Sequence, residues 1–117
     1  MKYMCLIYNS EAGTPGIIPA REREAVPAEV LAYAEELRRK GHFVAAHALQ
    51  SGQAATTVRV RNGRLSMTEG PGADRKEQLR AVVVLDARDL NEAIQLASRM
   101  PEASRGSIEI RPVEEPE

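Results

Sequence analysis

The sequence contains one cysteine, one phenylalanine and no tryptophan among its 117 residues. A single cysteine, Cys5, cannot form a disulfide within the chain, and it lies in an apolar run. We therefore expect a buried small hydrophobic side chain and a cytoplasmic protein. No stretch approaches the roughly 20 apolar residues of a membrane-spanning helix. The short apolar run over residues 1–8 is interpreted as a strand because no clear cleavage site follows it.

The charges exclude two classes of partner. Sixteen basic and seventeen acidic side chains give a net charge of −1, and both signs are spread along the chain. A nucleic-acid or anionic-membrane surface would need a concentrated basic patch, so neither partner is expected. With 43% apolar residues, the chain is predicted to form one domain over residues 1–117, with an acidic tail at 113–117.

Common catalytic and cofactor motifs are also absent. Gly70-Pro71-Gly72 matches neither phosphate-binding glycine pattern, and Ser10 and Ser51 lack the flanking glycines of a serine-hydrolase elbow. No spacing of histidine, cysteine and carboxylates is typical of a metal site. The sequence therefore predicts no metal and no cofactor.

Four segments have the patterns of sheet strands. Residues 2–8 and 79–86 are apolar on both alternating faces, which predicts two central strands. Residues 42–49 predict a strand with Phe43, Ala45, His47 and Leu49 on one side, and residues 107–111 alternate as a last strand. Between them, Asn62-Gly63 joins residues 56–61 to 64–68 in a predicted hairpin, which should lie at an edge or cover something.

Two segments have helical spacing. The first begins near Arg21, and Pro27 either kinks it or starts a second helix. Its apolar side chains are Val30, Tyr33, Ala34 and Leu37, and Gly41 ends it. The second is predicted to begin with a capping box of Asp89 and Glu92, and its buried stripe to consist of Leu90, Ala93, Ile94, Ala97 and Met100.

The order of these elements predicts an α+β fold. Strand, helix, strand, hairpin, strand, helix, strand is a ferredoxin-like split β-α-β sandwich with an antiparallel sheet and an inserted β-hairpin. Two helices should cover one face of the sheet. A second copy is the simplest cover for the other face, so we expect a homodimer.

The predicted strand order also brings a candidate site together. The ends of the first two core strands and the start of the third share one edge, which places Tyr8, His47 and Gln50 near the loop over residues 69–78. His47 can exchange protons near neutral pH, and Glu69 or Asp74 could orient it. The alternative is that His47 is an ordinary strand residue and that Lys76 and Glu77 form a solvated turn. His42, beside Gly41, is expected to be structural.

Several blocks of sequence, in the same order, resemble the YCII-related proteins of the DGPF subgroup. They are Met1 to Tyr8, Ala48-Leu49-Gln50, Ala55 to Gly63, Thr68-Glu69-Gly70-Pro71, Lys76-Glu77-Gln78-Leu79, Asp89 to Ala93 and Ile108 to Pro112. The resemblance implies a small dimeric domain related to dimeric α/β barrels, in which a histidine and an aspartate in a cleft form an active-site pair. It also implies that some members accompany sigma factors. Here Glu69-Gly70-Pro71-Gly72 stands where Asp-Gly-Pro-Phe is usual.

Two functional hypotheses follow. In the first, the protein binds or transforms a small polar or anionic metabolite. His47 and Glu69 act as an acid–base pair, Arg59 or Lys76 holds an anionic group, and Tyr8, Gln50 and Glu77 are further ligand contacts. In the second, the protein is a non-catalytic interaction module associated with sigma-factor transcriptional regulation, which uses its sheet face or its acidic tail.

Overall fold

A computed structural model describes residues 1–9, 28–50, 52–70 and 78–115. The elements are β1 (Lys2–Asn9), α2 (Ala28–Arg39), β2 (Phe43–Ala48), η2 (Gly52–Ala54), β3 (Thr56–Arg61), β4 (Arg64–Glu69), β5 (Gln78–Asp86), α3 (Leu90–Ser98), η3 (Pro101–Ser104) and β6 (Ser107–Pro112). The helical start expected near Arg21, with Pro27, lies outside the described residues.

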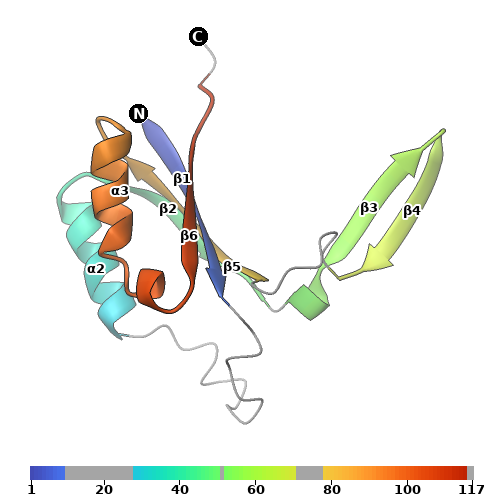
Figure 1. Ribbon diagram of the computed structural model, residues 1–117, viewed down its shortest axis with the longest axis horizontal. Coiled ribbons are helices and arrows are strands. Elements are labelled where there is room, and N and C mark those ends of the chain that lie inside the picture. The colour runs from blue at the N-terminus through green and yellow to red at the C-terminus, as the bar shows by residue number, and fades with distance from the viewer. Residues whose placement is uncertain (10–27, 51, 71–77, 116–117) are drawn as a thin grey trace.

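Four strands form an antiparallel sheet in the order β2-β5-β1-β6. The two strands that read as apolar on both faces, β1 and β5, lie at its centre, as predicted. Both helices lie on the same side of this sheet (Figure 1). The α+β, ferredoxin-like fold with an inserted hairpin is confirmed.

The core lies between the sheet and the two helices. Tyr3, Cys5 and Ile7 on β1 point into it and are almost fully buried. Leu85 on β5 joins them, and the helices contribute Leu37, Ala93, Leu96, Ala97 and Met100. Burial raises the pKa of the Cys5 thiol to about 11, so the thiol stays neutral at physiological pH. Cys5 therefore packs as a small hydrophobic residue, as expected.

The local signals for the helix ends are confirmed. Gly41 adopts φ of +80°, and the amide of His42 donates to the carbonyl of Leu37 at 2.9 Å, which closes α2 in a Schellman motif. Asp89 caps α3 by accepting from the amide of Glu92 at 2.9 Å. The Glu92 carboxylate reaches one residue further back than a capping box requires and accepts from the amide of Arg88 at 3.0 Å.

The predicted buried stripe of α3 is partly wrong. Leu90 and Ile94 are each 48% exposed, whereas Leu96 is buried. The helix is rotated by about one position, so that Ala93, Leu96 and Ala97 meet the sheet. The reason is the packing against β1 and β6, which sequence periodicity alone does not contain.

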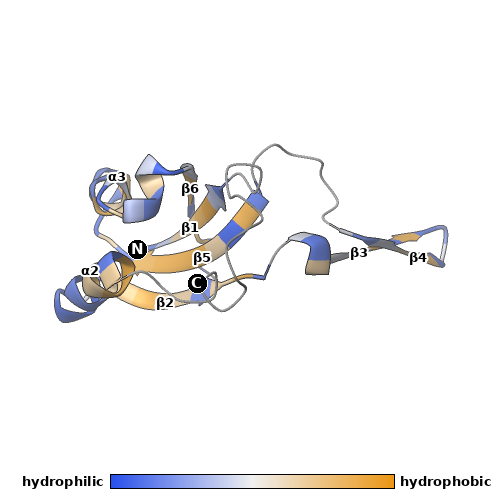
Figure 2. Ribbon diagram, turned by 90° about the horizontal axis from the view of Figure 1, so that it is seen from below, coloured by the Kyte–Doolittle hydropathy of each residue, from blue (hydrophilic) through white to orange (hydrophobic). Residues whose placement is uncertain are grey.

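The hairpin β3–β4 forms a separate two-stranded sheet. Asn62 and Gly63 both have positive φ, 55° and 74°, as the predicted turn requires. Figures 1 and 2 show this hairpin projecting sideways from the four-stranded sheet. The expectation that it lies at an edge or covers something is therefore not met within the described chain.

Gly106 lies where the backbones of β6 and β1 approach closely, and this approach gives a first prediction. A Cβ added at Gly106 would lie 2.0 Å from the carbonyl oxygen of Tyr8, a backbone atom with little freedom to move. We expect Gly106→Ala to lower the free energy of unfolding by about 3 kcal/mol, the upper end of the usual cost of overpacking. Gly41→Ala is the control, because a Cβ there meets nothing within 4 Å. Only its positive φ opposes it, at a cost of about 1 kcal/mol. If urea denaturation showed the same loss of unfolding free energy for both variants, the close approach of residue 106 to the carbonyl of Tyr8 would be contradicted.

Candidate functional site

Among the residues that the structure describes, no helix covers the face of the sheet turned away from α2 and α3, and we name this face the open face. The strand pairings define its rows. In one row His47 pairs with Val82, Val82 with Leu6, and Leu6 with Glu109. The next row consists of Ala45, Val84, Met4 and Arg111. The centre of the open face is thus an apolar floor made by Met4, Leu6, Val82 and Val84, with polar side chains on both rims.

A β-bulge in β2 determines which side chains reach the open face. Phe43 pairs with Leu85, but Ala45 pairs with its neighbour Val84, so Val44 is the extra residue. In a regular strand Phe43 and His47 would share one face, as the sequence predicted. That prediction is wrong, because the bulge turns Phe43 toward the helices and leaves His47 on the open face.

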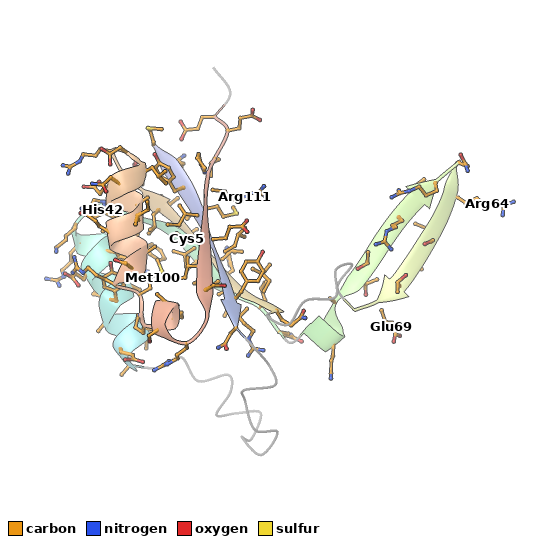
Figure 3. All side chains as sticks on the ribbon, in the orientation of Figure 1. Cys5, His42, Arg64, Glu69, Met100 and Arg111 are labelled. Atoms are coloured by element: carbon orange, nitrogen blue, oxygen red, sulfur yellow. The ribbon has the colours of Figure 1, made fainter. Side chains whose placement is uncertain are left out.

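The two rims differ in character. His47, which is exposed, lies on the β2 rim. Strands about 4.8 Å apart place it about 10 Å from Leu6 and about 14 Å from Glu109. On the β6 rim, Arg111 and Glu109 form an ion pair of 3.5 Å, and Figure 3 shows Arg111 on the side of β6 away from the helices. The two rims are therefore about 14 Å apart, and the apolar floor lies between them.

The residues of the β6 rim were missed by the sequence analysis. The alternation over residues 107–111 places Ile108 and Ile110 in contact with the core, and Glu109 and Arg111 must then point the opposite way. The signal was present in the sequence, but it was used only to recognise a strand.

The predicted shared edge is confirmed for three of its strands. Asn9 at the end of β1 pairs with Gln78 at the start of β5, and Tyr8 pairs with Leu79. Beyond β2, the amide of Leu49 still donates to the carbonyl of Arg80 at 2.8 Å. Tyr8 and the exposed Gln50 therefore belong to the same edge as the end of β2.

Glu69 and Arg59 belong to the hairpin. Glu69 ends β4 opposite Thr56, and Figure 3 shows it at the base of the hairpin, outside the four-stranded sheet. The base is closed by the amide of Gly70, which donates to the carbonyl of Ala55 at 2.7 Å. Lys76 and Glu77 lie outside the described residues, as do Gly72 and Asp74. The pairing of His47 with Glu69 therefore stays a prediction.

The two histidines have different surroundings. Within residues 1–9, 28–50, 52–70 and 78–115, no hydrogen bond or ion pair engages the side chain of His47 or of Glu69. By contrast, Nδ1 of His42 lies 2.9 Å from the carbonyl oxygen of Asp86, as expected of a structural residue. His42 precedes β2 and thus lies at the end of the sheet opposite Leu49. Only His47 combines exposure with a place beside the apolar floor.

The described residues include no group of three or more histidine, cysteine, aspartate or glutamate side chains placed to hold a metal ion. Neither of their α-helices has the length and apolar character needed to cross a membrane.

Comparison with known proteins identifies one family. The YCII-related domain matches residues 1–117. An uncharacterised protein of Rhizobium meliloti (strain 1021) is 32% identical over 115 residues, which are 97% of this chain and 92% of that protein. Among solved structures, the 5-chloro-2-hydroxyhydroquinone dehydrochlorinase of Burkholderia phenoliruptrix AC1100, in complex with 2,5-dihydroxybenzoquinone, aligns with a TM-score of 0.52. Its identity is 15%, over 97% of this chain and 94% of that one, so the likeness shows the fold alone.

The bulge generates a second prediction. Deleting Val44 removes the extra residue, so that either Phe43 leaves the core or His47 leaves the open face. We expect the deletion to lower the free energy of unfolding by about 2 kcal/mol, either because Phe43 loses its burial or because the polar imidazole of His47 is turned toward the core. Val44→Ala keeps the bulge at a side chain that is 45% exposed, and it should cost less than about 0.5 kcal/mol. Deletion without loss of stability in urea unfolding would show that the bulge does not set the register.

Proposed function

The chain belongs to the YCII-related domain family, and from this membership and the open face we propose that it binds a small polar or anionic molecule and transforms it by acid–base chemistry. The observation that carries the proposal is the position of His47. It is an exposed histidine on the rim of an apolar floor, and the bulge in β2 holds it on that side of the sheet.

The floor and the rim have complementary tasks. Small-molecule sites combine apolar walls with a few polar groups that fix orientation. Val82 and Leu6 would contact the carbon skeleton of the molecule, and His47 its polar group. Imidazole can accept a proton from an O–H or acidic C–H of the bound molecule and return it to another atom of that molecule. The net reaction is then an isomerisation or elimination step that consumes no co-reactant.

Other residues are proposed to assist His47 or to contact the ligand. Glu69 would accept a hydrogen bond from the imidazole and stabilise its charged form after proton transfer. Arg59 or Lys76 would hold an anionic group of the ligand. Tyr8 and Gln50 are supported as contacts by their place on the same sheet edge as His47, and Glu77 completes the proposed set.

The structural neighbour supports the class of ligand. The Burkholderia protein is named as a dehydrochlorinase, and its structure holds 2,5-dihydroxybenzoquinone, a small polar ring. A protein of this fold can therefore bind such a molecule. At 15% identity no residue of that enzyme is carried over to this chain.

The proposal predicts separable effects of its two central residues on ligand binding. Ligand-observed NMR with a set of small hydroxylated and carboxylated molecules should identify a binder. His47→Ala should weaken its affinity at least about tenfold, which is about 1.4 kcal/mol. Glu69→Gln, which keeps shape and removes charge, should weaken it less. His42→Ala is the matched control, because that histidine lies at the other end of the sheet, and it should bind as the unaltered protein does. Retention of every ligand by both site variants would refute the acid–base site.

The site is proposed to lie within a homodimer. Met4, Leu6, Val82 and Val84 form an apolar surface without a helical cover in the described chain, and a second copy related by a two-fold axis can cover it and be covered in return. Such a cover would enclose the floor and keep water from the bound molecule.

Sedimentation tests this assembly directly. At about 10 μM protein we expect about twice the chain mass of 12.8 kDa. A monomer under these conditions would contradict the homodimer.

A non-catalytic interaction module, associated with sigma-factor transcriptional regulation, is the second candidate. The same apolar floor favours it, since such a surface can also receive a protein segment. Stoichiometric capture of another protein, with no small molecule retained, would select this candidate over the enzyme.

A further inference from the structure

The hairpin β3–β4 is amphipathic. Directly opposed residues of an antiparallel pair share a face. Val58 is opposite Met67, and Val60 is opposite Leu65. These four side chains, which we name the apolar stripe, are between 56% and 67% exposed. The other face of the hairpin is polar and carries Arg59, Arg61, Arg64 and Ser66.

The apolar stripe is unusual because the hairpin is remote from the core. A two-stranded hairpin is at best marginally stable in water unless one face is packed. The radius of gyration is 16.2 Å, whereas a compact chain of this length has about 13 Å. Figure 1 shows the hairpin as the element that extends the molecule. Strict alternation of apolar and polar residues is the pattern of a half-buried ribbon, so the sequence predicts a cover for the stripe that the described residues of the same chain do not provide.

We propose that the apolar stripe packs across the open face of a second copy of this chain, and that the hairpin of that copy packs in return on the first. The inference rests on the homodimer of the proposed function and adds the element that holds it together. In this arrangement the hairpin is an exchanged arm.

The distribution of charge favours a second copy of this chain as the surface on which the apolar stripe packs. Three arginines and one glutamate give the hairpin a charge of +2, so the rest of the chain, whose total is −1, carries −3. The arm and the body of the protein are therefore oppositely charged. On the β6 side of the open face, Glu109 is paired with Arg111, and the exposed Glu114 and Glu115 follow β6 and add to the negative charge there. Two hairpins packed on one another would instead bring like charges together.

The dimensions also match. Six residues per strand give the arm a length of about 20 Å, and four strands make the open face about 14 Å wide. One arm can therefore cross the whole face. A two-fold arrangement buries both arms and both faces, which is the way to reach the roughly 800 Å² per partner of a stable dimer.

The test compares one substitution on each face of the hairpin. Val60→Asn removes an apolar side chain from the stripe, and Ser66→Asn places the same residue on the polar face without changing the net charge. Because neither position contributes to the core, circular dichroism should show both variants folded. In sedimentation equilibrium we expect Val60→Asn to raise the dimer dissociation constant at least about tenfold and Ser66→Asn to change it less than about twofold.

Ionic strength and crosslinking identify the surface beneath the arm. Between about 50 mM and 500 mM salt the dissociation constant should rise, because opposite charges are screened. A photo-crosslinker at position 60 should attach to residues 2–9 or 78–86 of the second copy, and one at position 59 should not. Crosslinks confined to the hairpin of the second copy, or a dissociation constant that falls with salt, would overturn the docking on the open face.

The remaining outcomes separate the two claims. A Val60→Asn dimer as tight as the unaltered one would overturn the arm while leaving the homodimer intact. A protein that stays monomeric up to about 100 μM would overturn both. Because the arm would cover the floor that the ligand is proposed to contact, the ligand titration is repeated on the Val60→Asn variant. Binding retained there, and lost in His47→Ala, would support the site whether or not the arm docks.

Discussion

The constraint on this fold is a four-stranded sheet that buries one of its two faces under α2 and α3, while its other, largely apolar face has no helical cover among the described residues. This constraint follows from the composition of β1 and β5, which are apolar on both sides along most of their length. Tyr3, Cys5 and Ile7 meet the helices, while Met4 and Leu6 do not. Within the described residues, the sheet is one layer and α2 with α3 is a second, and no helix forms a third layer over the open face. Homodimer, ligand site and docked hairpin are three consequences proposed from that one imbalance.

A single extra residue in β2, Val44, places a histidine beside the open face. Val44 shifts the alternation of β2, so that Phe43 supports the core while His47 lies beside the apolar floor. Ala45, two residues before the histidine, lies on the same face of the sheet, and its small side chain leaves room above the sheet. The bulge thus places a proton-exchanging group at the rim of a surface that would otherwise be purely a packing surface.

The sequence predicted the features that depend on neighbouring residues. Asn62-Gly63, Gly41 and Asp89 each act through their own backbone or through a residue three or four positions away, so their roles could be derived locally. The rotation of α3, which buries Leu96 and exposes Leu90 and Ile94, depends on contacts with strands far away in sequence. The bulge at Val44 arises from pairing with β5 and was missed for the same reason. Of the candidate site, strand order correctly predicted that Tyr8 and the end of β2 share an edge. Strand order carries no information about whether Glu69 approaches His47, because the hairpin forms a separate two-stranded sheet.

We propose that a second copy of the chain covers the open face, and methyl-resolved NMR in a dilution series tests this most directly. Leu6, Val82 and Val84 report on the open face, and Leu85 and Leu96 report on the helix-covered face. We expect the methyl resonances of the three open-face residues to shift as the protein is diluted through the dissociation constant of the dimer. The methyl resonances of the two residues on the helix-covered face should stay unchanged. Open-face methyl resonances that are constant across the series would contradict it.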